Sequence, residues 1–137
     1  ATLSDPEDTS FGHVGLVSPC CEIKLDSVPD MEYTVNDQPF PRGEVLIRGP
    51  PVFSGYFREP ELTKEVFTDD GWFRTGDIGQ WLKDGRLQII DRRKNMFKLA
   101  QGEYVASEKL ENIFTRSQFV GQIWVYGDSF KDFLVAV

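Results

Sequence analysis

The sequence contains few of the residues on which several protein classes depend. Its two cysteines, Cys20 and Cys21, are adjacent and cannot close a framework of disulfide-linked loops, so we expect a reducing intracellular compartment. The single histidine, His13, excludes a metal site built from several histidines, and we assign no residue to a metal.

Long apolar runs and an excess of positive charge are also missing. The longest apolar runs, residues 123–126 and 133–137, are far shorter than the ~20 residues that span a bilayer. Residues 1–8 are acidic and do not resemble a signal peptide. The chain has 22 acidic and 15 basic residues, for a net charge of -7, which argues against a nucleic-acid partner.

What is present predicts a strand-rich α+β fold. A length of 137 residues suggests one domain, and 12 glycines and 8 prolines favour short strands separated by turns. Residues 1–11 are expected to be loop. Short apolar segments, with clear alternation at 22–28, predict strands at residues 12–17, 22–28, 44–48, 72–74, 78–82, 87–90, 122–126 and 133–137. Apolar pairs at helical spacing predict helices at 60–67 and 105–117. The last strand stops without a turn, which is typical of a segment cut from a longer chain.

Four smaller features have structural interpretations. Ser107 is expected to cap the second helix, and the stripe from Leu110 to Phe114 is expected to be core. Cys20 and Cys21 are interpreted as half-buried side chains with no cation nearby to lower a thiol pKa. His13 is interpreted as a strand-end residue without a serine or carboxylate partner at catalytic spacing.

The densest chemistry lies between residues 70 and 94. Thr75-Gly76-Asp77 is predicted to be a tight turn that holds the Asp77 carboxylate outward, where its two oxygens can accept hydrogen bonds from both hydroxyls of a ribose. Asp-Gly at 84–85 predicts a hairpin, and Arg92 beyond it can reach the same sugar or its phosphate. The simpler interpretation is an ordinary turn aspartate and a surface ion pair worth about 0–1 kcal/mol.

Three motifs in order resemble the adenylate-forming (AMP-binding) enzymes, and within them the long-chain fatty acid–CoA ligases, or acyl-CoA synthetases. DGWFRTGDIG at 70–79, continuing to IIDRRK at 89–94, resembles the family's signature. GEVLIRG at 43–49 resembles its upstream strand motif, and KLAQGEYV at 98–105 resembles the segment after its linker in the long-chain form. The resemblance runs from about Phe11 to Val137.

The resemblance implies a domain division. Residues 1–90 correspond to the distal β-subdomain of the large AMP-binding domain, 91–96 to the hinge linker, and 97–137 to the start of the small α/β C-terminal lid domain. The single domain suggested by length would then be the junction of two.

The resemblance also implies roles for individual residues. Asp77 and Arg92 would bind the ribose of ATP or AMP, and Lys94 would lie at the hinge. Lys98 and the loop at Gly102 would face the site in the thioester-forming state, on the side of coenzyme A. Glu44 and Trp72 are expected to hold the β-subdomain together, and Arg74 has no assigned role.

The implied reaction needs parts that the chain lacks. The parent enzyme would use ATP and Mg²⁺ to convert a fatty acid into an acyl-adenylate, and coenzyme A would then give acyl-CoA and AMP. The phosphate-binding loop, the Mg²⁺-coordinating glutamate and the second catalytic lysine all lie outside this sequence, so the segment alone is expected to be inactive. The family's compartments include the endoplasmic reticulum membrane, the peroxisome and the plastid, and the resemblance leaves membrane association and oligomeric state open.

Two alternatives remain at this point. The parent can be another adenylate-forming ligase, for an aryl or shorter-chain acid, because the acid pocket lies elsewhere. The segment can also be a non-enzymatic, β-rich nucleotide-binding or interaction module.

Overall fold

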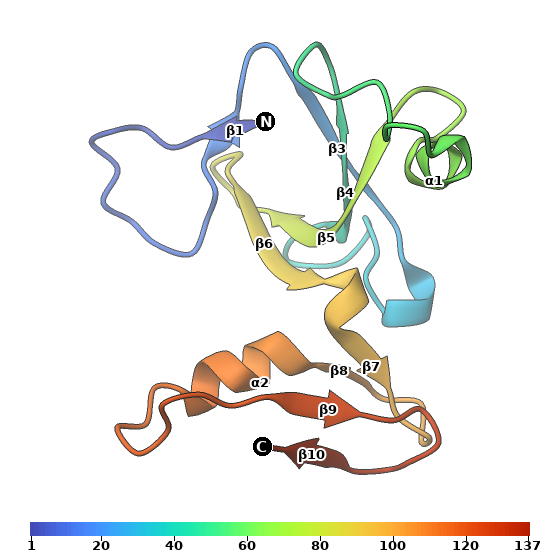
Figure 1. Ribbon diagram of the computed structural model, residues 1–137. Helices are drawn as coiled ribbons and strands as arrows, with labels where there is room; N and C mark the ends of the chain where they lie inside the picture. Colours follow the sequence, from blue (N-terminus) through green and yellow to red (C-terminus); the bar gives the residue numbers. More distant parts are fainter. The chain divides into compact units, whose positions relative to one another are not determined.

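A four-stranded sheet with the order β3–β4–β5–β6 dominates the first part of the chain (Figure 1). Its strands are β3 (Glu22–Asp26), β4 (Arg42–Arg48), β5 (Phe73–Trp81) and β6 (Leu87–Arg92). β4 runs antiparallel to both β3 and β5. The computed structural model describes all 137 residues, which divide into two compact units at 1–90 and 91–137.

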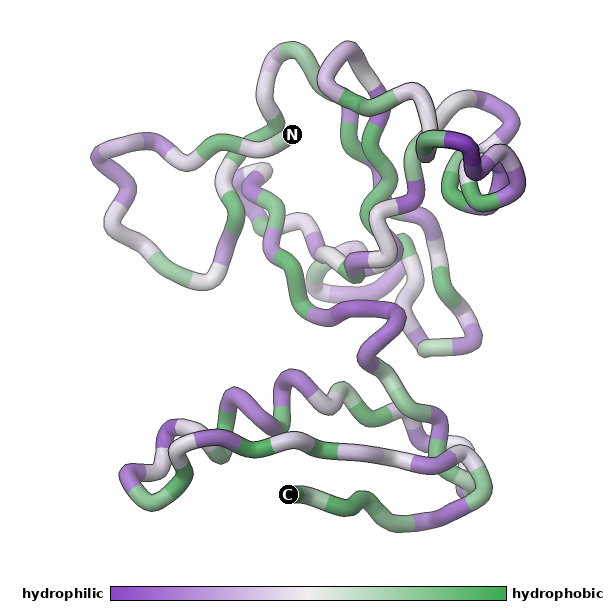
Figure 2. The backbone as a smooth tube through the Cα atoms, viewed as in Figure 1, coloured by the Kyte–Doolittle hydropathy of each residue, from purple (hydrophilic) through white to green (hydrophobic).

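The core of the first unit lies around this sheet. Ile78, Leu46 and Leu87 are the most deeply buried large side chains, with exposed fractions of 0%, 1% and 2%. Other buried apolar residues in this unit are Val28, Met31, Val45 and Trp72. Apolar residues gather along β3 and β4 in Figure 2, and in β4 they form the continuous run Val45-Leu46-Ile47.

Short elements surround the sheet. β1 (Thr2–Leu3) pairs antiparallel with β2 (Leu16–Val17), so the prediction of loop throughout residues 1–11 was wrong. A 3₁₀ turn, η1, spans Pro29–Met31. The helix α1 (Pro60–Val66) begins at its proline, as predicted, but buries none of its residues.

The second unit contains two small antiparallel sheets and a helix. Its elements are η2 (Arg93–Asn95), β7 (Met96–Lys98), β8 (Tyr104–Ala106), α2 (Ser107–Phe114), β9 (Val125–Gly127) and β10 (Leu134–Ala136). β7 pairs with β8, and β9 with β10. Leu99 and Val125 are its buried apolar residues. The predicted strand-rich α+β class is confirmed, although most strands are shorter than predicted.

Two predictions about the second helix were wrong. Ser107 does not cap it, because the N-cap is Ala106 and the Ser107 hydroxyl instead donates to the backbone oxygen of Asn95 at 2.9 Å. The stripe predicted to be core is half-exposed, with exposed fractions of 49% for both Ile113 and Phe114. The structure contains no helix with the length and hydropathy that a bilayer crossing requires.

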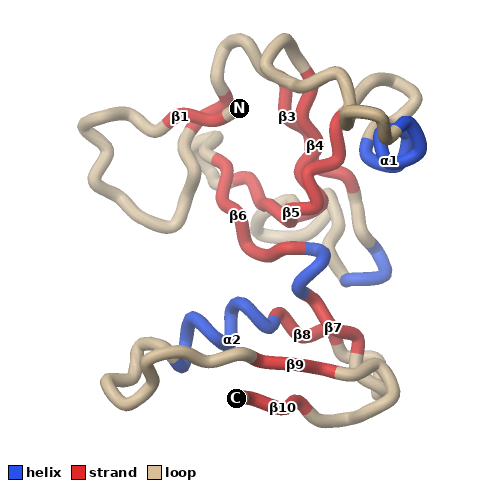
Figure 3. The backbone as a smooth tube through the Cα atoms, viewed as in Figure 1, coloured by secondary structure: helices blue, strands red, loops and turns tan.

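The predicted linker is made of regular structure. Figure 3 shows the chain passing from β6 through η2 to β7 with no loop between them. The same stretch is strongly hydrophilic in Figure 2. Its charge density suggested a free connection, but the backbone is hydrogen-bonded strand and 3₁₀ turn.

Candidate functional site

Asp77 lies in a bulge of β5, not in the turn that the sequence predicted. Glu44 pairs with Ile78 and Leu46 with Arg74, so three residues of β5 stand opposite Val45 alone. Gly76, in the middle, has φ +76, a value that L side chains rarely adopt. A strand therefore runs through Phe73–Trp81 without reversing, and the extra residues are displaced from its ladder.

The hydroxyl of Thr75 ties this bulge together. Thr75 Oγ1 donates to the backbone oxygen of Val45 at 2.8 Å and accepts the backbone N–H of Asp77 at 3.1 Å. The backbone of Asp77 is thus anchored to β4 through one side chain, and its own side chain is half-buried. Because the Asp77 backbone is already held in place, its carboxylate can accept two hydrogen bonds from a ligand without a loss of backbone conformational entropy.

A buried ion pair lies next to the bulge. The Glu44 side chain is 3% exposed, and its Oε2 accepts from Arg74 Nη1 at 3.1 Å. The same guanidinium nitrogen lies 3.4 Å from Asp26 Oδ2. Arg74, which had no assigned role, therefore links β5 to β4 and β3.

Trp72 has the packing contacts expected of it. It is 8% exposed, and the cationic groups of Lys24 and Arg48 lie 4.5 and 4.4 Å from its ring centroids. Arg48 also binds Glu22 through two hydrogen bonds, of 2.7 and 3.2 Å. These contacts tie Trp72 to β3 and β4 and are consistent with the packing role expected of it.

Arg92 and Lys94 lie where β6 gives way to η2, at the start of the second unit. The backbone N–H of Arg92 donates to the Asp91 carboxylate at 2.7 Å, while burial raises the pKa of Asp91. The neighbouring Asn95 anchors this segment within the unit, since its amide donates to Glu108 Oε2 at 2.7 Å.

Lys98 and Gly102 lie on the β7–β8 hairpin. Lys98 ends β7, with its Nζ 5.3 Å from the ring centroid of Tyr104. Gly102 has φ +91 within the connecting turn, and no atom lies within 4 Å of the position that a Cβ would take. The predicted site residues thus divide between the units, with Asp77 in the first and the other four in the second.

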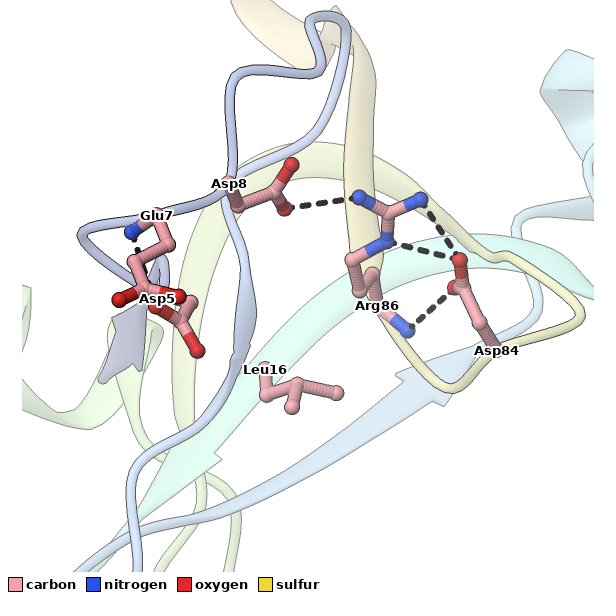
Figure 4. Close-up of a pocket in the computed structure, with 6 residues that line it drawn as sticks. All are labelled: Asp5, Glu7, Asp8, Leu16, Asp84 and Arg86. Carbon is pink, nitrogen blue, oxygen red and sulfur yellow. Dashed lines mark hydrogen bonds and ion pairs between the residues drawn. The ribbon is translucent and has the colours of Figure 1, made fainter.

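Neither of two surface pockets contains these residues. One, of about 430 Å³ in the first unit, is lined by Asp5, Glu7, Asp8, Leu16, Asp84 and Arg86 (Figure 4). The other, of about 660 Å³ in the second unit, is lined by Glu111, Asn112, Thr115, Gly121, Gln122, Ile123, Trp124 and Val137. The structure holds no group of three His, Cys, Asp or Glu side chains arranged to bind a metal ion.

The first pocket overlaps a cluster that the sequence did not reveal. His13 Nε2 lies 2.8 Å from Ser10 Oγ and 3.2 Å from Asp8 Oδ2, so the statement that His13 lacks such partners was wrong. Arg86 Nη1 lies 2.9 Å from Asp8 Oδ2, and Arg86 Nη2 lies 2.7 Å from Asp84 (Figure 4). The hydrogen bonds from Ser10, with a smaller effect of Arg86, lower the pKa of Asp8 to about 2. With Arg86 already paired to two carboxylates, the cluster is an anchor for the N-terminal loop.

Comparison with known proteins places this geometry in a family. No family model matches the chain. It is 59% identical over 133 residues to the peroxisomal long chain acyl-CoA synthetase 6 of Arabidopsis thaliana, and 58% identical over 137 residues to fatty acyl-CoA synthetase A of Dictyostelium discoideum. The chain is homologous to one segment of the long-chain acyl-CoA synthetases. The aligned region covers 97% and 100% of this chain but 19% and 20% of those synthetases.

Solved structures of other adenylate-forming enzymes share the fold of this chain. The A domain of a carboxylic acid reductase from Segniliparus rugosus, in complex with AMP and a carboxylic acid, matches 84% of this chain and 18% of its own, with a TM-score of 0.79 and 44% identity. An O-succinylbenzoate coenzyme A synthetase from Bacillus subtilis, in complex with AMP, matches 93% of this chain and 25% of its own, with a TM-score of 0.73 and 26% identity. The family resemblance seen in the motifs is therefore confirmed.

Proposed function

We propose that this chain is the part of a long-chain fatty acid–CoA ligase that binds the nucleotide ribose and joins the two moving domains. Identities of 50–59% to curated long-chain acyl-CoA synthetases, over nearly all of the chain, carry the proposal. The whole enzyme converts a fatty acid and ATP into an acyl-adenylate and pyrophosphate. The thiol of coenzyme A then displaces AMP and yields acyl-CoA.

Asp77 accepts hydrogen bonds from both ribose hydroxyls in this proposal. Its anchored backbone supports the role, because a preorganised acceptor loses little entropy when the nucleotide binds. Arg92 contacts the same nucleotide with a cation that remains charged at every working pH. Mg²⁺ accompanies ATP, and we assign no residue of this chain to it.

The segment 91–96 acts as the hinge, with Lys94 at its centre, and Lys98 and Gly102 face coenzyme A in the thioester-forming state. The boundary between the compact units, at residues 90 and 91, supports a division there. A rotation between half-reactions lets one site perform two chemically different steps. The names of two Arabidopsis relatives, long chain acyl-CoA synthetases 6 and 7, favour a peroxisomal compartment.

The decisive experiment measures thioester formation by the intact protein that carries this segment. ATP- and coenzyme A-dependent activity is expected with palmitate and not with coumarate. Activity confined to coumarate would replace the long-chain proposal with that of an aryl-acid ligase.

A substitution then tests the ribose contact. Asp77→Ala is expected to raise the KM for ATP about tenfold or more, since a hydrogen bond to a charged group contributes about 1.5–3 kcal/mol. Asp84→Asn, a carboxylate change in the β5–β6 turn, serves as the matched control and should leave this KM unchanged. An unchanged KM for ATP in Asp77→Ala would exclude the proposed ribose contact.

Separate half-reactions test the hinge side. Lys98→Ala is expected to slow the transfer of the acyl group to coenzyme A while pyrophosphate release from ATP and fatty acid proceeds normally. An equal loss of rate in both half-reactions would contradict the proposal that Lys98 lies on the thioester-forming face.

A second candidate follows from the reductase adenylation domains, which are 44–47% identical to this chain. In that case the intact protein would form the acyl-adenylate but give no thioester with free coenzyme A. The same assay distinguishes the two.

A further inference from the structure

The two cysteines lie side by side on an exposed turn between β2 and β3. Their sulfur atoms are 3.8 Å apart and unbonded, and both thiols are free. The Cys20 residue is exposed, while Cys21 is half-buried. The pair thus combines one accessible thiol with a second within contact distance.

The backbone holds this pair in place. The N–H of Cys21 donates to the oxygen of Ser18 at 2.9 Å and closes the turn. Behind it lies Gly49, where a Cβ would come within 2.6 Å of the Cys20 carbonyl oxygen. The backbone of the turn therefore packs against the end of β4, while the Cys20 residue stays exposed.

The two thiols have different surroundings. Ser18 Oγ lies 3.3 Å from Cys20 Sγ, and its hydrogen bond lowers the pKa of the Cys20 thiol. Burial raises the pKa of the Cys21 thiol. The expectation that both cysteines are half-buried was wrong for Cys20, which is exposed. The main cause of its lowered thiol pKa is a hydroxyl, a group that the sequence interpretation did not consider. Since the thiolate is the nucleophile, Cys20 is the attacking member of the pair.

We propose that Cys20 and Cys21 form a reversible redox site, in which Cys20 attacks a small-molecule disulfide such as oxidised glutathione and Cys21 resolves the mixed disulfide. In the first step the Cys20 sulfur bonds to one glutathione sulfur and the other glutathione leaves as its thiol. In the second step Cys21 attacks the Cys20 sulfur and releases the second glutathione thiol. Two protein thiols are oxidised to one disulfide, and one glutathione disulfide is reduced to two thiols.

The adjacent positions make the product labile. Consecutive Cα atoms are about 3.8 Å apart across a trans peptide, below the range of about 4.4–6.8 Å that most disulfides span. The ring that a Cys20–Cys21 disulfide closes is therefore strained, and the disulfide is readily reduced. This suits a reversible redox site and not a structural crosslink.

The test treats the intact protein with oxidised glutathione and analyses the peptide that carries residues 20 and 21 by mass spectrometry. The wild type is expected to lose two hydrogen atoms there, and dithiothreitol should restore them. Cys21→Ser should stop at a glutathione adduct on Cys20, and Cys20→Ser should react far more slowly. A stable adduct on the wild type, or peptide modification seen only after denaturation, would overturn the proposal.

A second experiment keeps both cysteines, so that its result does not depend on the folding of a cysteine variant. Alkylation of the native protein near neutral pH should label Cys20 well before Cys21, and Ser18→Ala should slow the labelling of Cys20 several-fold. Equal labelling of both cysteines, with no effect of Ser18→Ala, would contradict the assignment of Cys20 as the attacking thiol.

Discussion

The hydroxyl of Thr75 and the carbonyl oxygen of Val45 are 2.8 Å apart, and this hydrogen bond joins the bulge of β5 to β4. Thr75→Val keeps the shape of the side chain but removes a donor for Val45 and an acceptor for the N–H of Asp77. We expect a loss of about 1–3 kcal/mol in the free energy of unfolding, measured by urea titration. Thr75→Ser, which retains the hydroxyl, should lose much less; equal losses in the two variants would mean that methyl packing holds the bulge.

Gly76 tests the backbone of the same bulge. A Cβ there meets no atom within 4 Å, so Gly76→Ala should cost only the left-handed conformation at φ +76, about 1–2 kcal/mol. Gly43→Ala should cost more, because its Cβ would lie 2.4 Å from the backbone oxygen of Asp26. Thermal unfolding should show a lower melting temperature for Gly43→Ala than for Gly76→Ala. An unchanged melting temperature in Gly76→Ala would show that the bulge adopts another backbone conformation without loss of stability.

The bulge also marks a limit of prediction from sequence. Asp-Gly at 84–85 was correctly predicted as a hairpin turn, because positive φ and a local hydrogen bond define it without help from other strands. Thr75-Gly76-Asp77 contains the same kind of signal, yet it remains in a strand because β4 pairs on both sides of it. A local motif cannot show which of its neighbours has a distant partner.

Long sequence separation hid other parts of the structure. Arg86 meets Asp8 across 78 positions, and no periodicity relates them. The half-exposed face of α2 shows a different limit, since an apolar stripe reveals which face of a helix is apolar but not what covers it. Asp77 and Arg92 were candidates from the turn and hairpin pattern as well as from the motifs, whereas Lys94, Lys98 and Gly102 came from the resemblance alone. The nucleotide and coenzyme A roles of all five stay predictions.

The Glu44–Arg74 pair should contribute measurably to stability. Arg74→Met removes a donor from a carboxylate that is 3% exposed, and breaking a fully buried pair costs about 3–5 kcal/mol. Because the Arg74 side chain is 34% exposed, we expect a smaller loss than for a fully buried pair, about 2–3 kcal/mol, in urea unfolding. Lys64→Met breaks the exposed pair with Glu61 and should change stability by less than about 1 kcal/mol. Equal effects would show that burial of Glu44 is unimportant.

Protonation of Asp8 in acid should destabilise the N-terminal loop. Its pKa in the folded protein is about 2, below its ordinary value of 3.8, so the stability it contributes is complete above about pH 4 and is lost as the pH falls toward 2. The melting temperature of the wild type should therefore fall more steeply in this window than that of Asp8→Asn. Parallel curves would contradict the assigned role of Asp8.

Asp91 should give stability the opposite dependence on pH. Burial raises its pKa in the folded state, so the stability it contributes is present below its ordinary pKa and is lost as the pH rises through the folded value. Asp91→Asn should consequently be more stable than the wild type at neutral pH, with the advantage shrinking in acid. A variant less stable at neutral pH would show that the charged carboxylate is needed by the N–H of Arg92.

The continuity of β6, η2 and β7 has a consequence for protein engineering. A chimera is usually joined where a flexible linker separates its halves. From sequence alone, the charged stretch after Ile90 looks like a suitable place for such a junction, or seam. A seam directly after Ile90 would cut β6, which is paired with β5. A seam placed after Asn95 would instead separate that residue from Ser107 and Glu108, to which it is hydrogen-bonded. A recombined enzyme should instead inherit residues 87–108 from one parent and exchange sequence outside them.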